Sequence, residues 1–110
     1  MISFNSKKVR EQLIKEGVII ICRNHRISFG ITQAVFTNKK GKRELIGNVN
    51  IEYLEDSHNE DSEHDNIFLK YLTLSGFKTV GEWKRNHLDT MGRLWMNVYL
   101  TFIKVTMERL

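Results

Sequence analysis

The longest apolar run in the chain, residues 18–22, does most to limit the folds open to it. The run is Val-Ile-Ile-Ile-Cys, which is far too short to cross a bilayer as a helix. It is rich in β-branched residues and bounded by Gly17 and Arg23, so it predicts a short strand buried in a core. A chain of 110 residues is long enough for one domain with one such core.

The residues around this run predict an α+β domain with a curved sheet. A helix with one apolar stripe is expected to begin after Asn5 or Ser6 and to end at Gly17. Gly47 predicts a bulge or a close approach within a strand. The last strand is apolar on both faces, which suits the middle of a small closed sheet. The expected strands cover residues 2–4, 18–22, 31–36, 45–54 and 94–107, and the expected helices cover residues 6–16, 65–75 and 79–91, with a Thr79/Glu82 capping box opening the third.

Charge is distributed unevenly along the chain, whose net charge is +4. Residues 51–66 hold seven of the thirteen acids and no lysine or arginine, which leaves seventeen bases and six acids elsewhere. We therefore expect one domain, residues 1–110, with a flexible acidic loop at 55–64. A basic body attracts phosphate backbones, although many small proteins are basic for solubility alone.

Composition excludes several classes of protein. A single cysteine, Cys22, rules out an intramolecular disulfide framework and an all-cysteine zinc site. There is no proline, and the N-terminus lacks a basic region followed by an apolar block, so neither a proline-rich linker nor a signal peptide is predicted. We expect a cytoplasmic protein with no cofactor, no membrane association and no obligate protein partner.

Four groups of basic residues are candidates for a nucleic-acid-binding surface. Arg23, His25 and Arg26 follow the buried strand, and a strand end that opens onto a loop is a common position for a binding site. The other groups are Lys7 and Lys8 in the first helix, Lys39, Lys40, Lys42 and Arg43 at a hairpin tip, and Lys84 and Arg85 beside Trp83.

Each group also has a plainer interpretation. Arg23 could cap the sheet edge or pair with Glu16, and a lysine-rich tip could serve only to block edge association. Aromatic residues beside bases can stack on single-stranded nucleic acid, but Trp83 follows a capping box at a position typical of core packing. The role of Trp95 stays open.

Catalytic and metal-binding interpretations are weaker. Cys22 and His25 could form a nucleophilic pair, but a cysteine that ends an apolar run is by default a buried, inert thiol. His58 and His64 lie among carboxylates, but no helical frame or calcium-loop pattern fixes their geometry. We therefore expect no catalytic residue and no metal site.

Several strings along the chain resemble those of one known family. They are residues 17–23 (Gly-Val-Ile-Ile-Ile-Cys-Arg), 29–30 (Phe-Gly), 46–49 (Ile-Gly-Asn-Val), 75–83 (Ser-Gly-Phe-Lys-Thr-Val-Gly-Glu-Trp) and 98–102 (Val-Tyr-Leu-Thr-Phe). Their order and the chain length resemble the ASCH domain, a member of the PUA-like superfamily. The resemblance implies a small β-barrel of about five or six strands with flanking helices. It also implies a cleft, lined by residues 17–23, that binds RNA or a nucleobase.

Some members of that family hydrolyse an acyl amide on modified cytidine, and some are reported as nucleases. The resemblance implies that this chemistry depends on a lysine and a threonine near the start of the signature and on a glutamate. Here no lysine or threonine lies between Gly17 and Arg23, and Ser75 stands where an acid would precede the Gly-Phe pair. A guanidinium is a poor general base but a good phosphate ligand.

The sequence therefore favours a non-catalytic domain that binds RNA, single-stranded nucleic acid or a nucleotide. The alternative is an enzyme on the same fold, either an amidohydrolase of acylated cytidine or a ribonuclease. A third possibility is an interaction protein whose acidic loop binds a basic partner.

Overall fold

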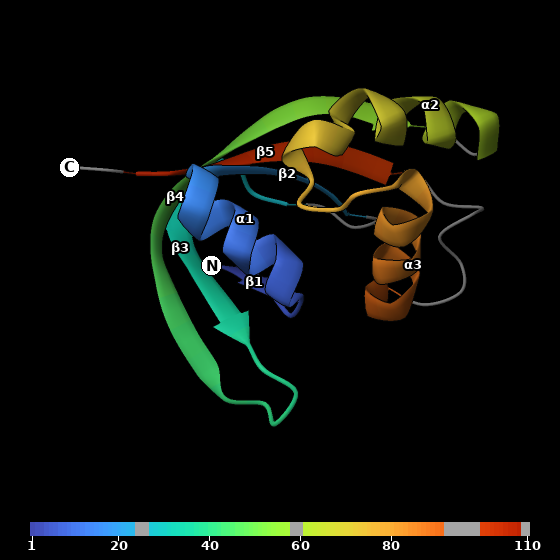
Figure 1. The fold of residues 1–110 in the computed structure, drawn as a ribbon. Coiled ribbons are helices and arrows are strands. Elements are labelled where there is room, and N and C mark those ends of the chain that lie inside the picture. The colour runs from blue at the N-terminus through green and yellow to red at the C-terminus, as the bar shows by residue number, and fades with distance from the viewer. Residues whose placement is uncertain (24–26, 58–60, 92–99, 109–110) are drawn as a thin grey trace.

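The computed structural model describes residues 1–23, 27–57, 61–91 and 100–108, and it shows an α+β domain built on one strongly curled sheet (Figure 1). Within the described residues the sheet has five strands in the order β1-β3-β4-β5-β2, and three α-helices accompany it. Among these five strands, only the β1–β3 pair is parallel. The elements are β1 Ile2–Phe4, α1 Lys7–Glu16, β2 Val18–Arg23, β3 Gly30–Thr37, β4 Arg43–Ser57, α2 Asp61–Tyr71, the short 3-10 helix η1 Leu72–Leu74, α3 Val80–Met91 and β5 Leu100–Met107.

The sheet is a half-barrel, so the expected α+β class and curvature are confirmed. β1 and β2 are its two edge strands, and the gap between them is called the seam below. The curvature comes largely from β4, which has two register irregularities. At the first, Ala34 pairs with Gly47 and Val35 pairs with Leu45, so one extra residue of β4 bulges out and bends the strand. The bulge expected at Gly47 is confirmed.

The buried strand predicted at residues 18–22 is confirmed in β2. Residues 19–22 are buried, and every residue of β2 pairs with β5. Ser6 caps the start of α1, where its hydroxyl accepts a hydrogen bond from the Val9 N–H, and Gly17 ends the helix in the left-handed conformation. The predicted bounds of this helix are therefore confirmed. Only Gly17 separates the end of α1 from the start of β2, so the helix packs directly against β2 and its neighbour β5.

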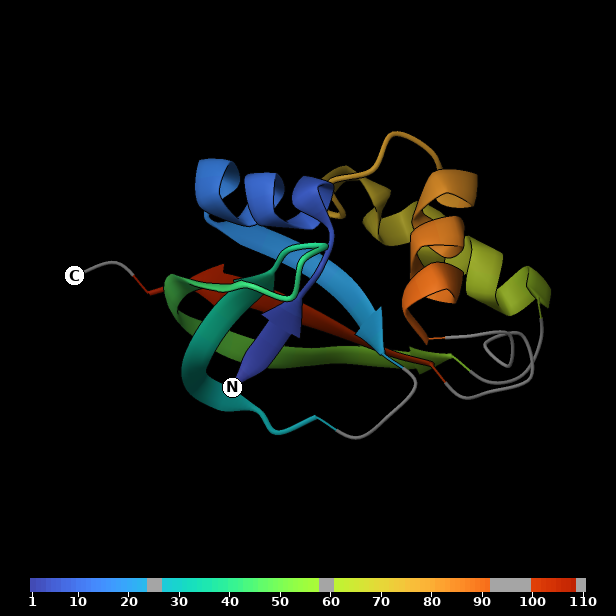
Figure 2. The same ribbon diagram turned by 90° about the horizontal axis from the view of Figure 1, so that it is seen from below.

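An aromatic cluster joins the helices to the sheet. Phe68 of α2 contacts Trp83 of α3 and Phe102 of β5 in edge-to-face geometry, with ring centroids 4.8 and 5.3 Å apart. The three side chains are almost completely buried. As a result α2 and α3 lie together at one end of the sheet (Figures 1 and 2). The core position expected for Trp83 is confirmed.

The expected acidic loop at residues 55–64 is wrong in its bounds. Glu55–Ser57 continue β4 and pair with β5, and α2 begins at Asp61, which leaves 58–60 outside the described residues. Glu55 is held by Lys70, whose Nζ lies 2.7 Å from Oε2, and by the Tyr71 hydroxyl. The hydrogen bond from Lys70 is the largest cause of a lowered pKa at Glu55, and the bond from Tyr71 adds to it. With these two partners the Glu55 carboxylate can be accommodated in an ordered strand.

The bounds of the helix expected at 65–75 also need correction, because α2 begins four residues earlier and its last turn is η1. Of the strand expected at 94–107, residues 100–107 are confirmed as β5, and residues 94–99 lie outside the described residues. The Thr79/Glu82 capping box is half formed: the Thr79 hydroxyl accepts a hydrogen bond from the Glu82 N–H. The Glu82 carboxylate instead pairs with Lys8 of α1, because an available cation competes with the helix N-terminus.

Candidate ligand-binding cleft

A cleft of about 770 Å³ lies at the seam of the half-barrel. Its lining comes from β1 and the residues that follow it, from the end of β2, from residues 27–29, from β3 and from α3. This volume is typical of small-ligand sites, and a sheet edge is a natural place for one because no neighbouring strand fills the space. The cleft combines apolar walls with a few polar groups.

Arg23 brings a cationic side chain to the cleft lining. As the last residue of β2 it reaches across the seam, where its Nη2 donates to the Ser3 carbonyl of β1 over 3.2 Å. Its Nη1 donates to the Cys22 carbonyl, also over 3.2 Å, and its guanidinium lies 5.9 Å from the centroid of the Phe4 ring. The side chain is thereby fixed by two backbone oxygens and one aromatic ring, and it joins the two edge strands.

The charge of Arg23 is not neutralised by a carboxylate among the residues that the structure describes. In particular, the pairing with Glu16 considered from the sequence does not occur. Burial lowers the pKa of the Arg23 guanidinium below its ordinary value, because desolvation disfavours the charged form. An arginine remains protonated at any ordinary pH. A partly desolvated cation without an anionic partner is a favourable position for a bound phosphate or carboxylate.

Cys22 and His87 meet at the floor of the cleft. The Cys22 Sγ lies 3.4 Å from the His87 Nδ1, and both side chains are buried. Burial raises the pKa of the Cys22 thiol to about 12, so the group is protonated near neutral pH and is a poor nucleophile. The inert thiol expected at Cys22 is consistent with this geometry. The proposed partner, His25, lies outside the described residues.

The sequence groups His87 with the basic residues around Trp83 and Trp95, and it predicts no place for His87 in the cleft. His87 comes four residues after Trp83 in α3, and this spacing places both side chains on the same helix face. The spacing could have placed His87 in the core, but not against Cys22, because that contact joins residues 65 positions apart.

The mouth of the cleft carries exposed apolar side chains that were also not identified from the sequence. Phe29 is 55% exposed and Ile31 is 72% exposed, and both belong to the lining. Met1 adds a third exposed apolar group at this rim. A polar floor with a cation and an apolar rim suits a ligand that has both an anionic and a planar apolar part.

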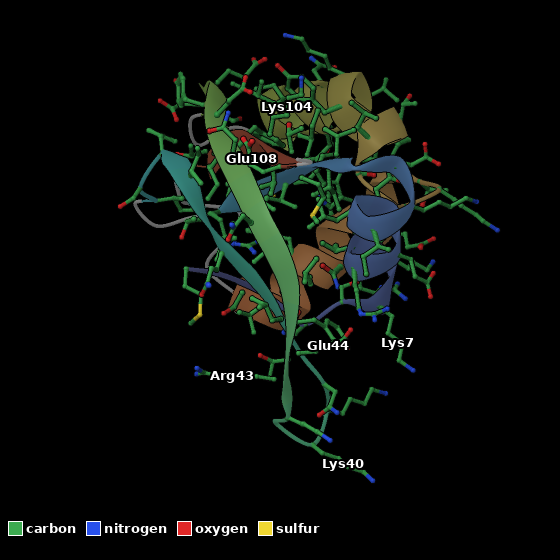
Figure 3. The ribbon with its side chains drawn as sticks, turned by 90° about the vertical axis from the view of Figure 1, so that its left-hand side faces the viewer. Lys7, Lys40, Arg43, Glu44, Lys104 and Glu108 are labelled. Carbon is green, nitrogen blue, oxygen red and sulfur yellow. The ribbon has the colours of Figure 1, made fainter. Side chains whose placement is uncertain are left out.

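A second basic region lies at one end of the molecule, and none of its residues belongs to the cleft lining. Lys40 and Arg43 of the β3–β4 hairpin share this end with Lys7 of α1, whereas Lys104 and Glu108 lie at the other end (Figure 3). This region is called the basic end below and consists of Lys7, Lys39, Lys40, Lys42 and Arg43, all of them exposed. The hairpin turn itself is ordered, since the Asn38 side-chain oxygen accepts hydrogen bonds of 2.9 Å from the N–H groups of Lys40 and Lys42.

The remaining predicted site residues are dispersed. Lys8 pairs with Glu82, and the Lys84 Nζ lies 2.5 Å from Asp65 Oδ1. Arg85 is exposed on α3 and is not part of the cleft lining. Arg26 and Trp95 lie outside the described residues. The structure thus brings Arg23 alone of the described candidates into the cleft.

Ser75 has a structural explanation. It is buried, its hydroxyl donates to the Leu72 carbonyl over 2.7 Å and accepts from the Phe77 N–H over 3.0 Å. It therefore fixes the turn that carries Phe77 to the cleft. Ser75 itself is not part of the cleft lining, whereas Phe77 is.

Within the part of the chain that the structure describes, no three histidine, cysteine, aspartate or glutamate residues are grouped as a metal site would require. No helix in these same ranges is both long enough and apolar enough to cross a membrane. The side chains of His58 and His64 are not among those described.

The chain matches no family model, and no curated protein or solved structure is significantly similar to it. The argument for a function therefore depends on the geometry of the cleft.

Proposed function

We propose that the chain is an RNA- or nucleotide-binding domain of the ASCH, PUA-like type, and that it binds through the cleft without catalysis. The observation that carries the proposal is Arg23, which is fixed by the Ser3 and Cys22 carbonyls, has no carboxylate partner among the described residues and lines the cleft. A guanidinium held in this way can give a phosphate two parallel hydrogen bonds.

The basic end supports a polyanionic ligand rather than a small carboxylate. The cleft lining includes Ser6 and Thr37. Ser6 directly precedes Lys7 in the chain, and Thr37 comes two residues before Lys39. A strand of nucleic acid in the cleft would therefore leave it towards exposed lysines, where the attraction is electrostatic and independent of sequence. A cytoplasmic location, where RNA is accessible, goes with this proposal.

Single-stranded nucleic acid fits the cleft better than a duplex does. Sequence-specific RNA recognition targets unpaired bases, because these can leave the stack and enter a pocket. Duplex DNA is read mainly by a helix or a two-stranded ribbon in the major groove. On α3, Lys84 is engaged by Asp65, and Trp83 and His87 are buried in the fold.

One observation favours the enzyme as a second candidate. The Cys22–His87 pair at the floor of the cleft has the residue types of a nucleophile and its base. Against it, the thiol has a pKa of about 12 and is fully buried, whereas reactive cysteines have a lowered pKa and are accessible. The binder is therefore the better-supported proposal.

A titration separates the two candidates. Fluorescence anisotropy with a labelled single-stranded RNA, its duplex and a labelled duplex DNA should show the tightest binding for the single strand. In the same samples the RNA should stay intact, and acetylated cytidine should release no acetate above background. Turnover that disappears in Cys22→Ala and His87→Gln would replace the binder with the enzyme, and equal affinity for all three nucleic acids would remove the cleft as the site.

A further inference from the structure

Phe29 is an aromatic residue that lines the same cleft as Arg23 and has much of its surface exposed. It lies directly before Gly30, which is the first residue of β3. Gly30 has a positive φ of 100°, a conformation that side-chain-bearing residues rarely adopt. This turn sets Phe29 at the mouth of the cleft, where the side chain is 55% exposed.

The ring is supported rather than loose. Tyr53 of β4 contacts it in edge-to-face geometry, with centroids 5.9 Å apart and an interplanar angle of 69°. The Tyr53 hydroxyl in turn donates to Asp56 Oδ2 over 2.8 Å. Asp56 also accepts a hydrogen bond of 3.0 Å from Thr101 of β5. A chain of contacts thus runs from the sheet to Phe29, and it limits the orientations that the ring can take.

A scattered exposed apolar residue needs no explanation, but Phe29 is not scattered. It lies with Ile31 and Met1 on the rim of the cleft that Arg23 also lines. An exposed planar ring and a fixed guanidinium in one cleft match the two parts of a nucleotide, namely its base and its phosphate.

We propose that Phe29 is the stacking platform for the base of the nucleotide whose phosphate binds Arg23, which makes the ligand an unpaired base in a single strand. This inference rests on the proposed function. A base in a duplex already stacks on both faces, so only an unpaired or terminal base can use the ring. Stacking on an aromatic side chain tolerates any base, because every base has a π-face. The ligand class is therefore set by the unpaired state rather than by base identity.

The test compares ligands that share the phosphate but differ in the base. The probes are a short single-stranded RNA, adenosine 5′-monophosphate and ribose 5-phosphate, the last two measured by competition against the labelled RNA. Phe29→Ala should weaken RNA and adenosine 5′-monophosphate by about 5- to 100-fold and leave ribose 5-phosphate unchanged. Phe29→Tyr should restore binding because it keeps the ring. Leu69→Ala is the matched control, since Leu69 is 64% exposed on α2 and outside the cleft lining.

A direct readout comes from Phe29→Trp, compared with the unmodified protein because Trp83 and Trp95 also fluoresce. The fluorescence added by the new indole should be quenched by RNA and by the mononucleotide but not by ribose 5-phosphate. Arg23→Gln, in contrast, should weaken all three probes. If Arg23→Gln weakens them and Phe29→Ala weakens none, the stacking inference is overturned and the proposed function stands. Equal loss of ribose 5-phosphate in Phe29→Ala would show a structural role and also overturn the inference. If no probe binds the unmodified protein, the proposed function fails and the inference with it.

Discussion

The cleft and the basic end both carry positive charge, but they present it in different ways. In the cleft, Arg23 is partly buried and held by two backbone carbonyls and the Phe4 ring. At the basic end, Lys39, Lys40 and Lys42 extend into solvent from a hairpin turn. A fixed, desolvated donor gives directional recognition, whereas exposed lysines give attraction that salt screens. Counting basic residues along the sequence cannot separate these two cases.

The largest expected difference between the two regions is in their tolerance of an added methyl group. Gly76 and Gly41 both have positive φ, 85° and 80°, but a Cβ at Gly76 would lie 2.9 Å from the Lys8 carbonyl, whereas Gly41 faces open space. Gly76→Ala should therefore cost roughly 2–4 kcal/mol of unfolding free energy and Gly41→Ala about 1–2 kcal/mol. Urea denaturation measures both. Equal losses would mean that the turn before Phe77 is not packed on α1 as described.

Removing the fixed guanidinium should have the next largest effect, this time on binding. Arg23→Gln should weaken single-stranded RNA by roughly 1.5–3 kcal/mol, because a charge-assisted contact is lost in a partly desolvated site. Lys15→Gln removes the same charge from the exposed last turn of α1 and should leave the affinity nearly unchanged. Anisotropy titrations measure the affinities, with circular dichroism as the folding control. A similar loss in both variants would reduce Arg23 to one more surface charge.

The buried thiol of Cys22 at the floor of the cleft should make the free energy of unfolding depend on pH. The exposed lysines of the hairpin provide no comparable buried group. The folded state raises the pKa of Cys22 from 9.0 to about 12, so the unfolded chain loses the thiol proton first. The stability contributed by the neutral thiol is complete below pH 9 and is lost as the pH rises towards 12. Between pH 9 and pH 10 the advantage of the wild type over Cys22→Ala should shrink by about 1 kcal/mol.

Urea denaturation of both proteins at pH 8, 9 and 10 tests this. An advantage that does not change with pH would show that the thiol is more accessible than its burial indicates. Alkylation of Cys22 gives a second measurement, since it should be slow in the native protein and complete once the protein is unfolded.

Neutralising the hairpin should have the smallest effect near physiological salt. Changing Lys39, Lys40 and Lys42 together to glutamine should cost less than about 1 kcal/mol of RNA affinity. The slope of log affinity against log salt should nevertheless flatten by about 2, since three phosphate contacts to a single strand are removed. Arg23→Gln should change the affinity more and the slope less. The reverse pattern, measured across several salt concentrations, would assign recognition to the basic end and leave the cleft without its proposed role.

Local structure was predictable where the determinants are close in sequence. The Ser6 cap, the helix end at Gly17, the buried strand of β2 and the bulge at Gly47 all follow from short-range rules. The acidic stretch was misjudged for a physical reason. Composition alone indicated a solvated loop, but Lys70 and Tyr71 supply partners that let Glu55 stay in β4.

The candidate site was less predictable, because its contacts join distant parts of the chain. Arg23 was identified at a strand end, but its hydrogen bond to Ser3 spans twenty residues. The approach of His87 to Cys22 and the pairing of Phe29 with Tyr53 likewise depend on how the sheet curls. No periodicity in the sequence reports such contacts, since they depend on the path of the whole sheet rather than on neighbouring residues.

The side-chain bridge across the seam has a consequence for how tightly the protein can hold a ligand. Elsewhere in the sheet, neighbouring strands are joined by backbone ladders, but β2 reaches β1 through the Arg23 Nη2 and the Ser3 carbonyl. A phosphate that draws Nη2 away from Ser3 exchanges an internal hydrogen bond for an external one, so only the difference between the two adds to affinity. The carbonyl acts as a tethered competitor that is always present. In the proposed complex, the fold itself would therefore assist release of the phosphate.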